Sequence, residues 1–133
     1  MEDNVNHPAH YTEGFANRPI ECIDITRHLP FTLGNAVKYI WRAGKKGDQE
    51  AALQDLDKAD WYVEDWRRHC GEEAPTGLRT ARAIFDLLER SGGDPLEQAR
   101  YNVLDSLLRH RVDMFNFDLA MQTMHRIIKH GQE

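Results

Sequence analysis

The sequence predicts an all-α fold, a compact bundle of about five to six helices whose N-terminal loop is ordered or closes over a ligand. Apolar residues recur at spacings of three and four along most of the chain, and residues that favour helix starts and stops bracket these segments. No segment alternates apolar and polar residues as a half-buried strand does. Because 133 residues suffice for one domain with a substantial core, we expect a helical region over 1–70 and a helical extension over 71–133 packed on it.

The first helix is expected after a loop of eighteen residues that is rich in turn formers and lacks periodicity. Pro19 is well placed at a helix start, and Pro30 ends a segment that runs to about His28. The residues expected to face inward are Ile20, Ile23 and Leu29.

The second helix is predicted from Thr32, which can cap it, to Gly44, which can adopt the left-handed conformation that ends helices. Its apolar stripe comprises Leu33, Ala36, Val37, Ile40 and Trp41. Asp48 can cap a long third helix that ends near Cys70 and Gly71. Its apolar seam comprises Ala52, Leu56, Ala59, Val63 and Trp66.

The remaining helices follow the linker EEAPTG at residues 72–77. A fourth helix begins at or after Thr76 and closes at the sequence SGG. Asp94, Pro95 and Glu97 provide a cap, a first-turn proline and a third-position carboxylate for a fifth helix. A sixth helix is predicted from about Asn116 to His130, with inward residues Phe117, Met121, Met124 and Ile128 and a stop at Gly131.

Composition excludes several classes of protein. The formal net charge of −5 gives no global electrostatic support for coating nucleic acid. No apolar run reaches the length of a membrane span, and the polar, acidic N-terminus is unlike a signal peptide. Cys22 and Cys70 form no CxxC pattern, which argues against a structural zinc site. We therefore expect a cytoplasmic protein.

The second helix carries a cationic side that could bind phosphate. Gly44 and Lys45 do not belong to a Walker loop, because the required upstream glycine and the following Ser or Thr are missing. The polar side instead follows helical spacing and comprises Asn35, Lys38, Tyr39, Arg42, Lys45 and Lys46. Arginine offers a planar fork to phosphate and lysine a point charge. The alternative is a solvated face whose cations favour the helix C-terminal dipole.

Two further clusters could carry chemistry. His7, His10 and Tyr11 could stack on a base or donate to a phosphate if the N-terminal loop closes over the site, or they could simply anchor the loop. A metal at the histidine pair lacks a visible third ligand. Asp57 and Asp60 on one side of the third helix could hold magnesium, although such an acidic run is also typical of surface ion pairs.

The segments NHPAHYTEG, IECID, LGNAVKYIWRAGKKG and DLDKADWYVEDW resemble the small phage-encoded nucleotide-kinase-like proteins, a domain of unknown function, over roughly residues 4–68. The resemblance implies transfer of phosphate to deoxynucleoside monophosphates without a Walker loop. The positions that carry it are His7, Pro8, His10, Tyr11, Glu21, Asp24, Gly34, Asn35, Lys38, Tyr39, Arg42, Gly44, Lys45, Asp55, Leu56, Lys58, Ala59 and Tyr62. The chain from about Gly71 onward has no counterpart in this resemblance.

The sequence leaves two functions open, and both require a phosphorylated nucleotide as partner, in the host cytoplasm if a phage encodes the protein. One is a kinase in which magnesium is the cofactor; the other is a non-catalytic sponge that sequesters a nucleotide signal of host antiviral immunity. A helical pyrophosphohydrolase is weaker, because its Glu-x-x-Glu pairs are absent. The surplus of apolar helical faces predicts a homo-oligomer with sites at or near subunit contacts, whereas a self-contained monomer is the alternative.

Overall fold

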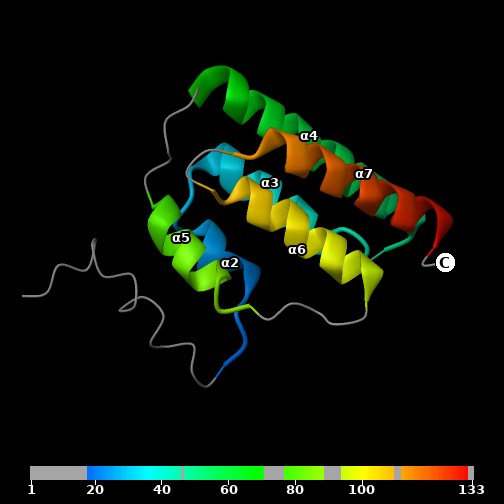
Figure 1. Ribbon diagram of the computed structural model, residues 1–133, viewed down its shortest axis with the longest axis horizontal. Helices are drawn as coiled ribbons and strands as arrows, with labels where there is room; N and C mark the ends of the chain where they lie inside the picture. The colour runs from blue at the N-terminus through cyan, green and yellow to red at the C-terminus, as the bar shows by residue number, and fades with distance from the viewer. Residues whose placement is uncertain (1–17, 46, 71–76, 89–93, 110–111, 132–133) are drawn as a thin grey trace, which may run out of the picture.

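The computed structural model describes residues 18–45, 47–70, 77–88, 94–109 and 112–131, and these residues form an all-α bundle without strands (Figure 1). The predicted fold class is therefore confirmed. The helices are α2 (Cys22–Thr26), α3 (Phe31–Arg42), α4 (Gln49–Cys70), α5 (Leu78–Phe85), α6 (Pro95–Leu107) and α7 (Met114–His130). No helix within the described ranges is both long and apolar enough to cross a membrane.

Four helices make the body of the bundle, because α3 packs on α4 and α6 packs on α7. The two pairs meet where α4 contacts α7 and α3 contacts α6. Helices α4 and α7 lie side by side and run in opposite directions (Figure 1), so that Gln49 at the start of α4 donates to the carbonyl of Ile128 near the end of α7 at 2.9 Å. The short helices α2 and α5 pack on each other, and α2 also packs on α3.

The core follows the predicted apolar stripes. All five seam residues of α4 are buried, as are Leu33, Ala36, Val37 and Ile40 of α3, while Trp41 is half-buried at the edge of the core. In α7, Phe117, Met121 and Met124 are buried and Ile128 is half-buried. Periodicity thus correctly identified the buried sides of α3, α4 and α7.

Several predicted helix ends are confirmed. Asp48 accepts from the backbone N–H of Ala51 at 2.9 Å, directly before α4, and Asp94 accepts from the N–H groups at the start of α6. Gly44 follows the end of α3 with φ +84°, the left-handed conformation expected of a C-terminal glycine. Glu97, expected to return a bond to the cap of α6, instead binds the guanidinium of Arg100.

The prediction for α2 was partly wrong. The helix begins at Cys22 rather than near Pro19, and Ile23, expected inside, is 53% exposed. Asp24 lies inside instead, because its carboxylate accepts from the backbone N–H of Glu21 and from the guanidinium of Arg18. This bonding turns the opposite side of α2 to solvent. The expected Thr32 cap is also wrong, since α3 begins at Phe31 with Pro30 in the cap position.

A close backbone contact fixes how α5 lies against the end of α2. Gly77, in the cap position of α5, has φ +86°, and a Cβ built on it would lie 1.9 Å from the carbonyl oxygen of His28. Only glycine fits there, because both the dihedral angle and the contact exclude a side chain.

Candidate functional site

The polar side of α3 forms a row of exposed cations. Lys38, Arg42 and Lys45 all reach solvent, while Asn35 on the same side donates to the carbonyl of Phe31 at 3.0 Å. Lys58 of the neighbouring helix α4 adds a fourth exposed cation beside them. We call the set of Lys38, Arg42, Lys45 and Lys58 the cationic ridge.

The ring of Tyr39 lies at the centre of three of these cations. The distances from the ring centroid are 4.6 Å to Lys38 Nζ, 5.1 Å to Arg42 Cζ and 5.4 Å to Lys58 Nζ. All three lie within the range of a cation–π interaction. Tyr39 also stacks on Tyr62 of α4, with ring centroids 6.0 Å apart and an interplanar angle of 11°. The aromatic pair therefore keeps three like charges close together.

Arg42 is held in one orientation by a buried carboxylate. Its Nη2 lies 2.7 Å from Asp55 Oδ1 and its Nε 3.3 Å from Oδ2, while the Asp55 side chain is only 6% exposed. The hydrogen bond to Asp55 raises the pKa of Arg42, and the nearby charge of the carboxylate adds to the effect. The Arg42 side chain remains 48% exposed, so it can also receive a second anion.

Exposed aromatic rings extend the ridge toward α4. Phe31 is 76% exposed and Trp61 is 62% exposed, and both contact Tyr62 edge-on, at 6.3 Å and 5.2 Å between centroids. Large apolar rings at such exposure are unusual unless they meet a ligand or partner.

A small cavity on the other flank of α3 is lined by residues of α3, α5 and α6 and of the turns that follow α3 and α5. Its volume is about 200 Å³, and it is lined by Trp41, Lys45, Phe85, Leu88, Glu97, Arg100, Tyr101 and Leu104. The Nζ of Lys45 lies 5.0 Å from the centroid of the Trp41 ring. Partial burial lowers the pKa of Lys45, and the charge of Arg100 lowers it further. Lys45 thus stands where the cationic ridge meets the cavity.

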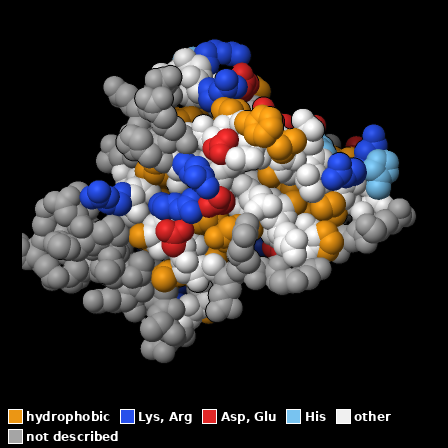
Figure 2. Space-filling model, viewed as in Figure 1, with side chains coloured by type: hydrophobic (Ala, Val, Ile, Leu, Met, Phe, Trp, Pro, Cys, Tyr) orange, Lys and Arg blue, Asp and Glu red, His pale blue; other side chains and the backbone are white. Residues whose placement is uncertain are grey.

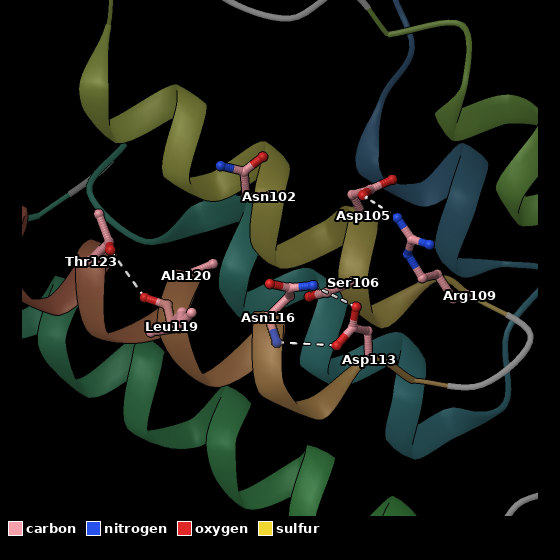
Figure 3. A pocket seen from close by; sticks show the side chains of 9 residues that line it. All are labelled: Asn102, Asp105, Ser106, Arg109, Asp113, Asn116, Leu119, Ala120 and Thr123. Atoms are coloured by element: carbon pink, nitrogen blue, oxygen red, sulfur yellow. Dashed lines mark hydrogen bonds and ion pairs between the residues drawn. The ribbon is translucent and has the colours of Figure 1, made fainter.

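A second cavity of about 350 Å³ opens between α6 and α7 (Figure 3). Its side chains bind one another: Asp105 accepts from Arg109 at 3.0 Å, and Asp113 accepts from the side chain of Asn116. Arg82 and Arg109 lower the pKa of Asp105 although burial opposes this, and the bonds from Asn116 lower the pKa of Asp113. Figure 2 shows basic and acidic side chains beside one another over α5 and the adjoining end of α6. Two ionised carboxylates make this cavity unfavourable for phosphate.

The candidate magnesium ligands lie away from the ridge. Asp60 on α4 lies near His125 and Asp118 of α7, with Asp57 beside it. Asp60 is an exposed residue, but neighbouring atoms partly desolvate its carboxylate and so raise its pKa. The negative charges of Asp57 and Asp118 raise this pKa further. Within the described ranges, no group of three or more His, Cys, Asp or Glu side chains could hold a metal ion.

The structure brings together four of the sequence-predicted site residues, since Asn35, Lys38, Tyr39 and Arg42 share one side of α3. Lys45 lies on the same helix end but contacts Trp41. The other candidates, His7, His10, Tyr11 and Lys46, lie outside the described residues.

Sequence reasoning missed that α4 completes this group of cations and rings. Lys58 and Tyr62 lie four residues apart and therefore share one side of α4, which faces Tyr39. Both residues stand in the segment DLDKADWYVEDW and are among the positions that carry the family resemblance, but neither was predicted as a ligand-binding residue.

Comparison with known proteins gives two similarities. Residues 5–64 match the DUF3310 family, described as a protein of unknown function. The gene 1.7 protein of enterobacteria phage T3 is 35% identical over 75 residues, which cover 53% of this chain and 46% of the phage T3 protein. The matched part therefore spans about half the length of that relative, and no solved structure matches the chain. These similarities support a phage protein of unknown function, and neither indicates a kinase-like family.

Proposed function

We propose that this protein binds a phosphorylated nucleotide on the cationic ridge. The observation that carries the proposal is the gathering of Lys38, Arg42 and Lys58 around the ring of Tyr39. Each of the three cations lies within 5.4 Å of the ring centroid, and an anion bound among them would relieve the repulsion of like charges gathered around one ring. A phosphate chain offers several acceptor oxygens to several donors at once, which suits one arginine and two lysines.

The local charge balance supports the same ligand class. Of the three cations around Tyr39, Arg42 is paired with the buried carboxylate of Asp55, so these four residues together carry two positive charges in a chain whose formal net charge is −5. Because Asp55 holds Arg42 through Nε and Nη2, the guanidinium needs little reordering to receive a phosphate oxygen. Aromatic rings flank the ridge on both sides and offer stacking surfaces for a base.

The proposal covers two alternatives, a kinase and a sponge. A kinase needs a donor and an acceptor nucleotide side by side, usually with magnesium bridging the phosphates. The ridge provides one concentrated set of cations, which favours binding of a single nucleotide without conversion. Magnesium, where required, would arrive with the phosphates rather than in a preformed protein cage.

The test is to incubate the protein with a panel of nucleotides, with and without magnesium and ATP, and then to denature it and identify what is released. Release of an intact nucleotide supports the sponge, and a newly phosphorylated product supports the kinase. If the native protein retains no nucleotide in any condition, and calorimetry detects none bound, the proposal is wrong.

Lysine variants connect this activity with the ridge. Lys58→Ala should weaken nucleotide binding about 10-fold or more, the effect of losing one charged hydrogen bond of at least about 1.5 kcal/mol. Because Lys58 is exposed, its replacement should leave the fold intact. Lys129→Ala, at an exposed position near the end of α7, is the matched control and should bind as wild type does. If Lys58→Ala binds nucleotide as tightly as Lys129→Ala does, the nucleotide does not bind on the cationic ridge.

We further propose that the protein forms a homo-oligomer. Besides the rings near the ridge, Phe115 and Leu119 of α7 are 73% and 48% exposed and lie four residues apart on one side of that helix. A second copy could cover such faces. Light scattering at micromolar concentration tests this, since a mass near 15.4 kDa would mean a monomer.

A further inference from the structure

The cavity between α3, α5 and α6 has the size of a subsite rather than of a whole ligand site. Its volume is about 200 Å³, whereas pockets for drug-sized molecules span about 300–1,000 Å³. It could therefore enclose one small ring system while the rest of a ligand stays outside. Lys45, which lines the cavity, lies three residues after Arg42 at the end of α3, and Lys38 lies one helical turn before Arg42 on the same side of the helix.

Aromatic side chains form two walls of this cavity. Phe85 of α5 and Tyr101 of α6 pack together with ring centroids 4.9 Å apart, and Trp41 of α3 lines the cavity as well. Phe85 is buried, while Trp41 and Tyr101 are half-buried and so present part of their surface to the space between them. Flat apolar walls of this kind favour a planar ring.

Charged side chains supply hydrogen-bonding groups at the same place. The side chain of Arg100 is 4% exposed, and its Nη2 lies 3.0 Å from Oε2 of Glu97. Glu97 remains 33% exposed, so its carboxylate can accept further hydrogen bonds, and the ammonium of Lys45 can donate them. A planar ring with both N–H donors and carbonyl or ring-nitrogen acceptors matches this combination, and nucleobases have it.

We propose that this cavity binds the base of the nucleotide whose phosphates lie on the cationic ridge. The inference rests on the proposed function and adds the location of the base. Lys45 joins the two parts, because it lines the cavity and lies three residues after Arg42, the last residue of α3. The open aromatic surface at Phe31 and Trp61, on the other flank, lacks an enclosing wall and is left to a different partner.

The first experiment narrows the cavity with a matched control. Leu88 lines the cavity and is half-buried, whereas its neighbour Leu87 is exposed and does not line it. Calorimetry would compare Leu88→Phe with Leu87→Phe for binding of the four deoxynucleoside triphosphates, ATP and inorganic tripolyphosphate. We expect Leu88→Phe to weaken binding of the preferred nucleotide at least 10-fold while binding tripolyphosphate as wild type does, and Leu87→Phe to change neither.

The outcomes separate this inference from the proposed function. If Leu88→Phe binds every nucleotide as tightly as Leu87→Phe, the base does not enter the cavity, although nucleotide binding to the ridge still stands. If the wild-type protein binds neither nucleotides nor tripolyphosphate, the proposed function fails and this inference fails with it. Circular dichroism establishes that each variant is folded.

A second measurement needs no variant. Irradiation of the wild-type protein with 5-iodo-dUTP, followed by peptide mapping, should attach the uracil to segments that contain Trp41 or Tyr101. Excess tripolyphosphate should reduce the yield, because it competes for the ridge. Attachment confined to the segment with Trp61 and Tyr62 would place the base on the open surface and overturn the inference, whether or not Leu88→Phe folds.

Discussion

Arg100 of α6 donates hydrogen bonds to the C-terminal end of α3. The last four carbonyls of a helix lack partners within it. Here the carbonyl of Tyr39 accepts from Ala43 and that of Arg42 accepts from Lys45, at 3.0 Å and 2.9 Å. The remaining two carbonyls, of Ile40 and Trp41, both accept from Nη1 of Arg100. We predict that Arg100→Met destabilises the protein strongly, because those two carbonyls lose their partner.

The expected loss of stability follows from the burial of Arg100 and from the groups that lose their hydrogen-bond donor. Methionine keeps the apolar part of the side chain but removes charged hydrogen bonds, each of which contributes about 1.5–3 kcal/mol. The side chain of Glu97 is 33% exposed, so water can replace the hydrogen bonds that it loses. The side chain of Arg100 is 4% exposed, so its bonds to the carbonyls of α3 lie inside the protein. Leaving a carbonyl inside the protein without its donor costs about 1–3 kcal/mol, so the loss of both bonds to α3 predicts a cost of about 2–6 kcal/mol for Arg100→Met.

Urea unfolding followed by far-UV circular dichroism measures the effect as a shift of the midpoint at unchanged slope. The control is Arg67→Met, because Arg67 also pairs with a glutamate three residues earlier, Glu64, but at 48% and 56% exposure of the two side chains. That exposed pair should contribute less than about 1 kcal/mol. If Arg100→Met is no less stable than Arg67→Met, Arg100 does not close the end of α3.

Three further outcomes are expected. Gly77→Ala should abolish folding or cost at least about 4 kcal/mol, because the new Cβ meets a backbone carbonyl. Gly131→Ala, at φ +81° and ψ −177° but in open space, should cost only about 1–3 kcal/mol of backbone strain, and similar urea midpoints for the two variants would refute the contact. The bond from Arg18 lowers the pKa of Asp24 below its unfolded value, so this stabilisation is present at neutral pH and is lost as the pH falls below about 4. The urea midpoint should therefore fall more steeply with acid in wild type than in Asp24→Asn, and equal slopes would contradict the assignment. Burial raises the pKa of Cys22 to about 11, so alkylation of this thiol at pH 8, followed by peptide mapping, should be at least about tenfold slower than in the urea-unfolded chain. Equal rates would show that the thiol is accessible and ionised as in an unfolded peptide.

Sequence reasoning succeeded where the determining forces are local. The caps at Asp48 and Asp94 and the stop at Gly44 depend on residues within one helical turn, and the seam of α4 depends on spacing alone. α2 was misjudged because a polar group competes there with the apolar pattern. The bond between Arg18 and Asp24 outweighs the exposure of Ile23, which periodicity had placed inside.

The site was predictable only in part, because its organising contacts join distant positions. Arg42 and Lys38 could be assigned to one side of α3, but the contact between Arg42 and Asp55 links two helices. The bonds from Arg100 to α3 connect residues 59 and 60 positions apart. Each partner was readable as an ordinary surface charge, and only the packing of α3 against α4 and α6 reveals which charges are buried and which remain available.

The last turn of α3 is held by different parts of the chain. Asp55, within the segment 5–64 that matches DUF3310, orients Arg42, and Arg100, beyond that segment, binds the carbonyls of the same turn. The ridge therefore lies within the matched segment, since Lys58 does too, whereas most of the cavity wall comes from residues 85–104 outside it. If phosphates bind the ridge and the base enters the cavity, the matched segment supplies affinity for the phosphate chain, and the extension determines which base is accepted. Substitutions at Tyr101 should then change the order of preference among nucleotides while leaving tripolyphosphate binding unchanged, a separation that a site confined to α3 and α4 would not produce.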